Sequence, residues 1–254
     1  MKVIGILVFC LSLSLGPSLE AGTVAYWRFE DSAASEANPE DFGLELSPSI
    51  QFSDDVPSTR ILDDGQNLAN AYSYQNGTSE EGSRLAPSKL LDDVIGGGSF
   101  TIEGFLKLAD GASKKKHLRI IGNSYYLGSP GGWAITVSEG KLGFNALQRL
   151  GTTESSSQAI LTSVKSFSEN AWHHFAVVGY RTPDVLVVRL FLDGEESEVE
   201  HPGNFYPASA GEEAIVPNED PILISSKNIF LGALDEIRIS DIALDPTEFL
   251  QAAP

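Results

Sequence analysis

The chain has little sulfur and few long hydrophobic runs. Its 254 residues include one methionine and one cysteine, Cys10, which lies in an apolar N-terminal stretch. The sequence therefore excludes disulfides and thiol chemistry from everything that follows this stretch. Beyond residue 21, no segment approaches the roughly 20 consecutive apolar residues that a membrane-spanning helix needs. We therefore expect no membrane span in the mature chain.

Residues 1–21, MKVIGILVFCLSLSLGPSLEA, have the features of a secretory signal. Lys2 gives a positive start, residues 3–15 form an apolar core, and the small residues Ser18 and Ala21 are candidate cleavage positions. We predict that the chain is exported, to the periplasm or out of the cell. The mature part, residues 22–254, has a length that suits one large β-domain.

Positive charge is also scarce. The chain has 17 lysines and arginines against 35 acidic residues, for a formal net charge of -18. Nucleic-acid binding needs a basic surface that matches the phosphates, so we expect no nucleic-acid partner. An acidic surface suits an extracellular protein that self-repulsion keeps soluble, or one that collects divalent cations.

Helical periodicity is scarce, and alternation with a period of two dominates. In SFTIEGFLKL (99–108), apolar side chains alternate with Thr101, Glu103 and Lys107, as in a half-buried strand. The segments between such runs are rich in Gly, Ser, Asn, Asp and Pro, which favour turns. This pattern predicts an all-β fold, a two-sheet antiparallel β-sandwich. Further strands are expected at 23–29, 118–122, 133–137, 141–144, 172–178, 185–192, 222–225 and 233–240.

Two short helices and one long loop complete the expected elements. Residues 85–95 have the length and pattern of a short helix, and Asp245 followed by Pro246 is a typical helix start. Residues 53–67, SDDVPSTRILDDGQN, are mostly polar, and we expect a loop there.

Several stretches occur in an order that resembles a known family. They are GTVAYWRFED (22–31), GGGSFTIEGFLKL (96–108), GGWAITVSEGKLGF (131–144), AWHHFAVV (171–178), LFLDGE (190–195) and FLGALDEIRISDIALDPTEF (230–249). Together they resemble the laminin-G-like domains of the concanavalin A-like lectin/glucanase superfamily, in the form found in secreted bacterial proteins. Two departures are Phe105, where relatives often carry tryptophan, and residues 32–65, which match nothing in the family.

The resemblance implies a jelly roll of two antiparallel sheets. In relatives that have a ligand, it lies on the concave face or on the rim loops. Members include both binding modules and enzymes, so the fold alone does not decide the activity.

The closing motif FLGALDEIRIS (230–240) places Asp235 and Glu236 side by side. Regular alternation would put Asp235 on the face of the isoleucines and Glu236 beside Arg238, as an exposed ion pair. A carboxylate among isoleucines needs a partner. One alternative is a set of hydrogen bonds from the neighbouring terminal strand. The other is a structural calcium ion, which related β-glucanases carry at a similar point, with Asp31 and Asp235 as its expected ligands.

A catalytic carboxylate pair is not evident. Retaining glucanases of this superfamily carry Glu-x-Asp-x-Glu, which holds two carboxyl groups about 5–5.5 Å apart on one strand face. The nearest run, GEESEVE (194–200), alternates Glu196, Glu198 and Glu200 but follows a hairpin turn and lacks aromatic neighbours. We interpret it as a charged edge strand and predict no catalytic residue.

The adjacent histidines His173 and His174 suggest a metal site at first sight. Neighbouring residues on a strand point to opposite faces, so the two cannot bind one metal together. We interpret them as structural residues of a core strand.

Candidate ligand-binding residues lie in three loop-like stretches. Tyrosines there could stack on a sugar ring while asparagines hydrogen-bond to its hydroxyls; the alternative is that the tyrosines only cover the edges of the core. The candidates are Tyr74, Asn123, Tyr125, Tyr126, Asn204 and Tyr206.

Three functions are compatible with these features. The first is a secreted, non-catalytic recognition module that binds a glycan or a protein partner through rim loops, with a possible structural calcium. The second is a glycoside hydrolase or polysaccharide lyase, which requires a carboxylate pair that strand alternation does not reveal. The third is a structural matrix component that binds no small ligand.

Overall fold

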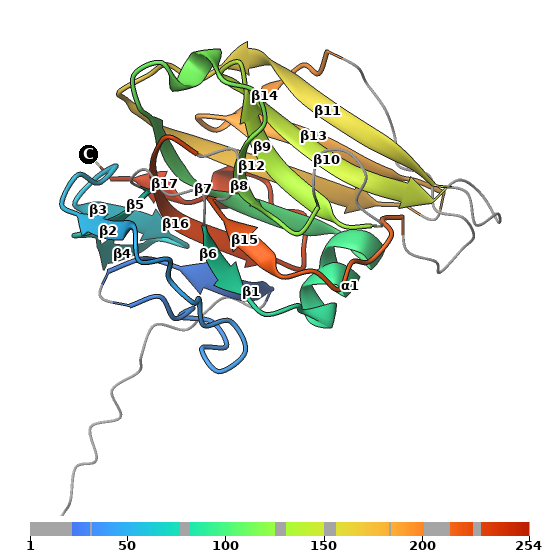
Figure 1. The fold of residues 1–254 in the computed structure, drawn as a ribbon, viewed down its shortest axis with the longest axis horizontal. Coiled ribbons are helices and arrows are strands. Elements are labelled where there is room, and N and C mark those ends of the chain that lie inside the picture. The colour runs from blue at the N-terminus through green and yellow to red at the C-terminus, as the bar shows by residue number, and fades with distance from the viewer. Residues whose placement is uncertain are drawn as a thin grey trace, which may run out of the picture.

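Two antiparallel sheets pack face to face, and a small third sheet covers part of one outer face (Figure 1). The computed structural model describes residues 22–30, 32–76, 82–124, 131–149, 156–182, 184–200, 214–225 and 230–253. The predicted antiparallel β-sandwich is confirmed. No helix among these residues is long and apolar enough to cross a membrane.

The larger sheet, sheet A, has eight strands. In order across the sheet they are β14 (Glu195–Ser197), β13 (Leu186–Leu192), β12 (Trp172–Arg181), β7 (Phe100–Leu108), β16 (Gly232–Ser240), β5 (Ser73–Asn76) and β2 (Ile50–Ser53), with β1 (Thr23–Trp27) also paired to β16.

Sheet B has six strands, and sheet C has three. Sheet B runs β11 (Ser156–Ser166), β10 (Lys141–Arg149), β9 (Trp133–Ser138), β8 (Leu118–Gly122), β15 (Ile222–Ile224) and β6 (Ser83–Leu85). Sheet C runs β17 (Gln251–Ala252), β3 (Arg60–Asp63) and β4 (Gln66–Ala69).

Every strand predicted from alternation is present. The prediction of a loop over residues 53–67 is wrong, because Arg60 pairs with Ala69 and Asp63 with Gln66 in the β3–β4 hairpin. Strand β11 and the short strands β2, β5, β6 and β17 were also not predicted. These strands are short or rich in small polar residues, so they carry a weak hydrophobic alternation.

Both predicted helices are present, although the first begins at Lys89 and not at residue 85. Helix α1 (Lys89–Gly97) begins after Ser88, whose hydroxyl accepts the Leu91 amide N–H. The second start is a short 3₁₀ turn, η2 (Pro246–Glu248), where Asp245 and Glu248 cap each other's backbone in a capping box.

The main core lies between sheets A and B. Phe100, Ile102 and Leu106 of β7 point into it and are completely buried. Phe100 meets Phe144 of the opposite sheet, with ring centroids 5.9 Å apart. These alternating inward side chains are the ones that the sequence pattern predicted for this strand.

A β-bulge interrupts the closing strand β16. Its pairing with β7 shifts register between Asp235, opposite Phe105, and Arg238, opposite Glu103. Glu236 adopts a left-handed backbone conformation with φ 52°. The extra residue keeps Asp235, Glu236 and Arg238 all on the outer face of sheet A. The prediction that Asp235 shares the face of the isoleucines is therefore wrong.

A buried ion pair lies at the centre of this outer face. Glu103 is completely buried and accepts hydrogen bonds from Arg238 Nε (2.9 Å) and Nη2 (2.6 Å). His174 Nε2 lies 2.9 Å from the same carboxylate, and the Leu250 amide N–H donates to it at 2.9 Å. Burial raises the pKa of Glu103, but the hydrogen bond from His174 and the charge of Arg238 outweigh it and hold the pKa below its usual range.

This ion pair holds the C-terminal segment and sheet C against sheet A. Arg238 also donates to Asp63 Oδ1 of β3 at 2.6 Å and to the Glu248 carbonyl at 3.0 Å. Two small apolar clusters fill the remaining space, one around Ile61 and Phe105 and one around Phe249. The sheet's outer face is therefore a second, smaller core.

Replacing Glu103→Gln should destabilise the protein strongly. The buried Arg238 would lose its main counter-charge, and breaking one side of a buried pair costs about 3–5 kcal/mol. Chemical denaturation should show this loss in the free energy of unfolding. Glu195→Gln is the control, since it removes an exposed ion pair with Lys165 and should change stability very little. Equal losses of unfolding free energy for the two substitutions would contradict a stabilising role for the buried ion pair.

Candidate functional site

Asp235, the predicted calcium ligand, is completely buried. Its Oδ2 accepts from Asn70 Nδ2 at 2.9 Å, and its Oδ1 accepts the Glu236 amide N–H at 3.0 Å. The groups that donate to Asp235 are therefore the Asn70 amide and the backbone of Glu236. The neighbouring terminal strand, which one alternative predicted as the donor, is not among them. Burial, with the charge of Glu236, raises the pKa of Asp235 well above its usual value. Asp31, the other predicted ligand, lies outside the described residues.

Glu236 does not form the exposed ion pair with Arg238 that alternation predicted. It is completely buried, and its carboxylate accepts from the Tyr26 hydroxyl and from Arg28 Nε at 3.1 Å. Burial raises the pKa of Glu236 to about 7, although the charge and hydrogen bonds of Arg28 lower it. The bulge causes this change of partner, because it turns Glu236 toward β1.

The predicted sugar-binding residues divide into two groups. Tyr74 is completely buried against Phe29, with ring centroids 5.1 Å apart, so its prediction as a stacking platform is wrong. Asn123 is also buried and donates from Nδ2 to Asp92 Oδ1 at 3.1 Å. The other candidates, Tyr125, Tyr126, Asn204 and Tyr206, lie outside the described residues.

The two histidines point to opposite sides of β12, as predicted. His174 lies against Glu103 on the outer face, whereas His173 lies 2.7 Å from Ser168 Oγ and 2.8 Å from Asp193 Oδ2. Across the described part of the chain, no group of three or more His, Cys, Asp or Glu side chains is arranged to hold a metal ion.

A polar hollow of about 350 Å³ lies on the outer face of sheet B. Its floor is built from outward-pointing residues of three adjacent strands, β9, β10 and β11. We call it the polar hollow; its described lining residues are Lys116, His117, Thr136, Ser138, Glu139, Lys141, Gly143, Asn145, Ile160, Thr162 and Glu200.

Gly143 keeps the floor of the polar hollow low. It pairs with Thr136 on one side and Thr162 on the other. A Cβ at position 143 would lie 2.8 Å from Thr136 Oγ1, closer than side chains pack. Glycine therefore brings hydroxyl groups of the two neighbouring strands to the floor without a side chain between them.

Asn145 is the unusual residue of the hollow. It is 3% exposed, and its Nδ2 lies 3.0 Å from Thr136 Oγ1, while its Oδ1 has no hydrogen-bond partner. Reversing the amide would only exchange the two atoms, so one polar atom lacks a partner in either orientation. A buried amide atom without a partner costs free energy unless a ligand or water satisfies it.

Charges at the rim of the polar hollow are paired with each other. Lys116 lies 3.3 Å from Glu139, and Lys141 contacts Glu200. Burial and the charge of Lys116 lower the pKa of His117, so its imidazole is neutral at pH 7. The lining charges thus cancel, which suits a neutral, polar ligand.

The acidic run 194–200 does not assemble a catalytic pair. Glu195 to Ser197 form β14, an edge strand of sheet A, as predicted. Glu196 lies 3.6 Å from Arg189, whereas Glu200 reaches Lys141 of sheet B. The run therefore spreads its carboxylates over two sheets.

Comparison with known proteins identifies the family. The profile of the concanavalin A-like lectin/glucanases superfamily, Laminin_G_3, matches residues 81–249. The chain belongs to this superfamily. No curated protein sequence matches it.

Solved structures with the same fold include binding domains of bacterial toxins. The binding domain of Paraclostridial Mosquitocidal Protein 1 has a TM-score of 0.60 at 15% identity, over 89% of this chain and 50% of that one. The botulinum neurotoxin DC binding domain in complex with rat synaptotagmin II has a TM-score of 0.57 at 10% identity, over the same shares. This superfamily chain spans about half the length of either structure, and at such identities the likeness establishes the fold.

The raised pKa of Glu236 predicts a pH dependence of stability. A carboxyl that holds its proton more tightly when folded adds stability below its unfolded pKa and loses it as pH rises. We expect the free energy of unfolding, measured with a chelator present, to fall between about pH 4.5 and 7. Glu236→Gln should make the free energy of unfolding less dependent on pH in this range. An unchanged pH dependence would contradict the raised pKa of Glu236 as its cause.

Proposed function

We propose that the protein is an exported, non-catalytic recognition module that binds a neutral glycan in the polar hollow. The observation that carries this proposal is the buried Asn145 amide, which has an unsatisfied polar atom on a floor of threonine hydroxyls. A sugar ring presents adjacent hydroxyls, each both donor and acceptor, which can pair with an amide and with hydroxyl side chains.

The charges of the polar hollow favour a neutral ligand over an anionic one. A phosphate or sulfate needs a basic group to pair with, and the two lysines of the hollow already pair with Glu139 and Glu200. The net charge of -18 adds a long-range repulsion of anions. An uncharged sugar needs no basic partner and is not repelled by the net negative charge.

Binding without cleavage accords with the carboxylates present. Glycoside hydrolysis generally needs one acid and one base or nucleophile flanking the bond. Glu139 and Glu200, the acids that line the hollow, each contact a rim lysine. The binding domains of similar fold support the same class of function by analogy. Tyr125, Tyr126, Asn204 and Tyr206, which lie outside the described residues, remain predicted ligand-binding residues.

A structural calcium at Asp235 is a second part of this proposal. The Asp235 carboxylate is buried, and the neighbouring Asn70 has a buried Oδ1 without a hydrogen-bond partner. Both are oxygen donors of the kind that calcium prefers, and Glu30 adds negative charge nearby. Asp235 and Asn70 would hold the ion, with Asp31 as the predicted third side chain. Its chemistry would be to neutralise Asp235 and tie the first strand to the last.

Glycan binding is tested with the mature protein on an array of neutral, sulfated and phosphorylated oligosaccharides. We expect neutral glycans to bind, and Asn145→Ala to weaken them about tenfold because it removes the amide pair. Asn67→Ala, an exposed substitution on sheet C, is the control. Retention of anionic glycans alone would contradict the proposal. Concentration-dependent self-association without any glycan affinity would favour the structural alternative, and new reducing ends would favour an enzyme.

Calcium binding is tested by calorimetric titration and by thermal unfolding with and without a chelator. We expect a binding heat and a higher melting temperature with calcium, because an ion that binds only the folded state stabilises it. Asp235→Asn should abolish both effects. If calcium produces neither heat nor a melting shift in the wild-type protein, the calcium proposal is wrong, while the glycan proposal stands.

A further inference from the structure

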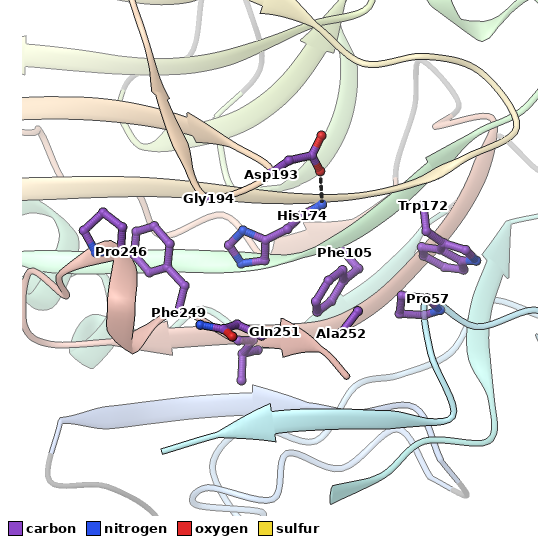
Figure 2. Close-up of a pocket in the computed structure, with 11 residues that line it drawn as sticks. Pro57, Phe105, Trp172, His174, Asp193, Gly194, Pro246, Phe249, Gln251 and Ala252 are labelled. Carbon is purple, nitrogen blue, oxygen red and sulfur yellow. Dashed lines mark hydrogen bonds between the residues drawn. The ribbon is translucent and has the colours of Figure 1, made fainter. Parts of the chain in front are cut away.

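A second pocket, unrelated to the polar hollow, lies on the opposite side of the molecule. It occupies about 370 Å³ on the outer face of sheet A, between the β13–β14 turn and the C-terminal segment (Figure 2). We call it the aromatic pocket. Figure 2 shows the rings of Phe249, His174, Phe105 and Trp172 following one another across it, with Asp193 at its edge.

The rings of the aromatic pocket are held in place by the surrounding structure. His174 packs between Phe105 and Phe249, with centroid separations of 5.2 and 5.5 Å. Trp172 is fixed at the other end because its indole N–H donates to Asp55 Oδ1 at 3.0 Å. Rings that are fixed before binding can contact a ligand with little loss of side-chain entropy.

The pocket has a carboxylate whose partners are a histidine and a backbone amide rather than a lysine or arginine. Asp193 accepts the His174 amide N–H at 3.0 Å and contacts His173 Nδ1 at 2.8 Å, yet 56% of its side chain is exposed. No lysine or arginine stands among the described lining residues. The nearby Lys107 is already bound to Asp55 at 2.7 Å.

Aromatic faces together with a carboxylate attract a cation. An ammonium or guanidinium group within about 6 Å of a ring centroid is stabilised by the ring quadrupole, most strongly over tryptophan. The net charge of -18 draws cations toward the whole molecule. The volume of the pocket exceeds that of one side chain, which leaves room for flanking backbone.

The C-terminal strand favours a peptide as the source of the cation. Gln251 and Ala252 line the pocket and form β17, the exposed edge of sheet C. An extended peptide can hydrogen-bond to such an edge while its side chain enters a neighbouring pocket. A zwitterionic lipid headgroup fits less well, since no basic residue of the described lining can pair with its phosphate.

We propose that the aromatic pocket is a docking site for a lysine or arginine side chain of an extracellular protein partner. This site is independent of glycan binding in the polar hollow, and either can fail without the other.

The test uses tripeptide amides with a central arginine, lysine, norleucine or glutamate, titrated into the mature protein. Tryptophan fluorescence is a suitable signal, because Trp27 and Trp133 are buried in the main core and Trp172 lies at the pocket. We expect the arginine and lysine peptides to bind roughly tenfold more tightly than norleucine, and more weakly as salt increases. The glutamate peptide should give no signal.

Two substitutions at the pocket change its charge and test the proposal without relying on loss of folding, and a third serves as the control. Asp193→Asn retains an oxygen acceptor but removes the charge, and Gln251→Lys places a positive charge at the mouth; both should weaken the cationic peptides at least several-fold. Val164→Lys makes the same charge change at an exposed position on sheet B and should leave binding intact. Equal binding of norleucine and lysine peptides, or no binding of any peptide, would overturn the proposal.

Discussion

The buried ion pair between Glu103 and Arg238 organises the outer face of the larger sheet. Removing two charges from water costs free energy unless the buried groups make hydrogen bonds at every position. Here Glu103 receives hydrogen bonds from Arg238 and from the Leu250 backbone, with His174 alongside, while Arg238 also reaches Asp63 and the Glu248 carbonyl. The C-terminal segment and sheet C supply these last contacts, so the ion pair and the covering layer require each other.

This covering layer gives the two outer faces of the sandwich different chemistry. Sheet B presents threonine hydroxyls, a glycine and the Asn145 amide between paired rim charges. Sheet A is covered by a layer whose edge forms a pocket lined by aromatic rings and Asp193. One face suits neutral hydroxyl groups and the other suits a cation, so the two proposed sites would let a single domain hold a glycan and a protein partner at once.

Local chemistry made most of the fold predictable from the sequence. Alternation located the main strands, and the Asp245-Pro246 pair marked a helix start that the capping box confirms. The closing motif was misassigned because strict alternation assumes a regular strand, and the bulge at Glu236 adds one residue. Neighbouring acids that should have separated instead share the outer face. The β3–β4 hairpin was missed because its composition is polar, and only its docking on Arg238 and Tyr26 explains its place.

The polar hollow could not be predicted, because its floor depends on the register that places Thr136, Gly143 and Thr162 side by side on three strands, and its signal is an unsatisfied atom. The aromatic pocket depends in the same way on the docked C-terminal segment. The most direct test of this account is therefore hydrogen exchange at the Leu250 amide, which donates to Glu103. We predict that it exchanges as slowly as the central amides of β7 and β16. Exchange within seconds, as in an undocked tail, would contradict the account.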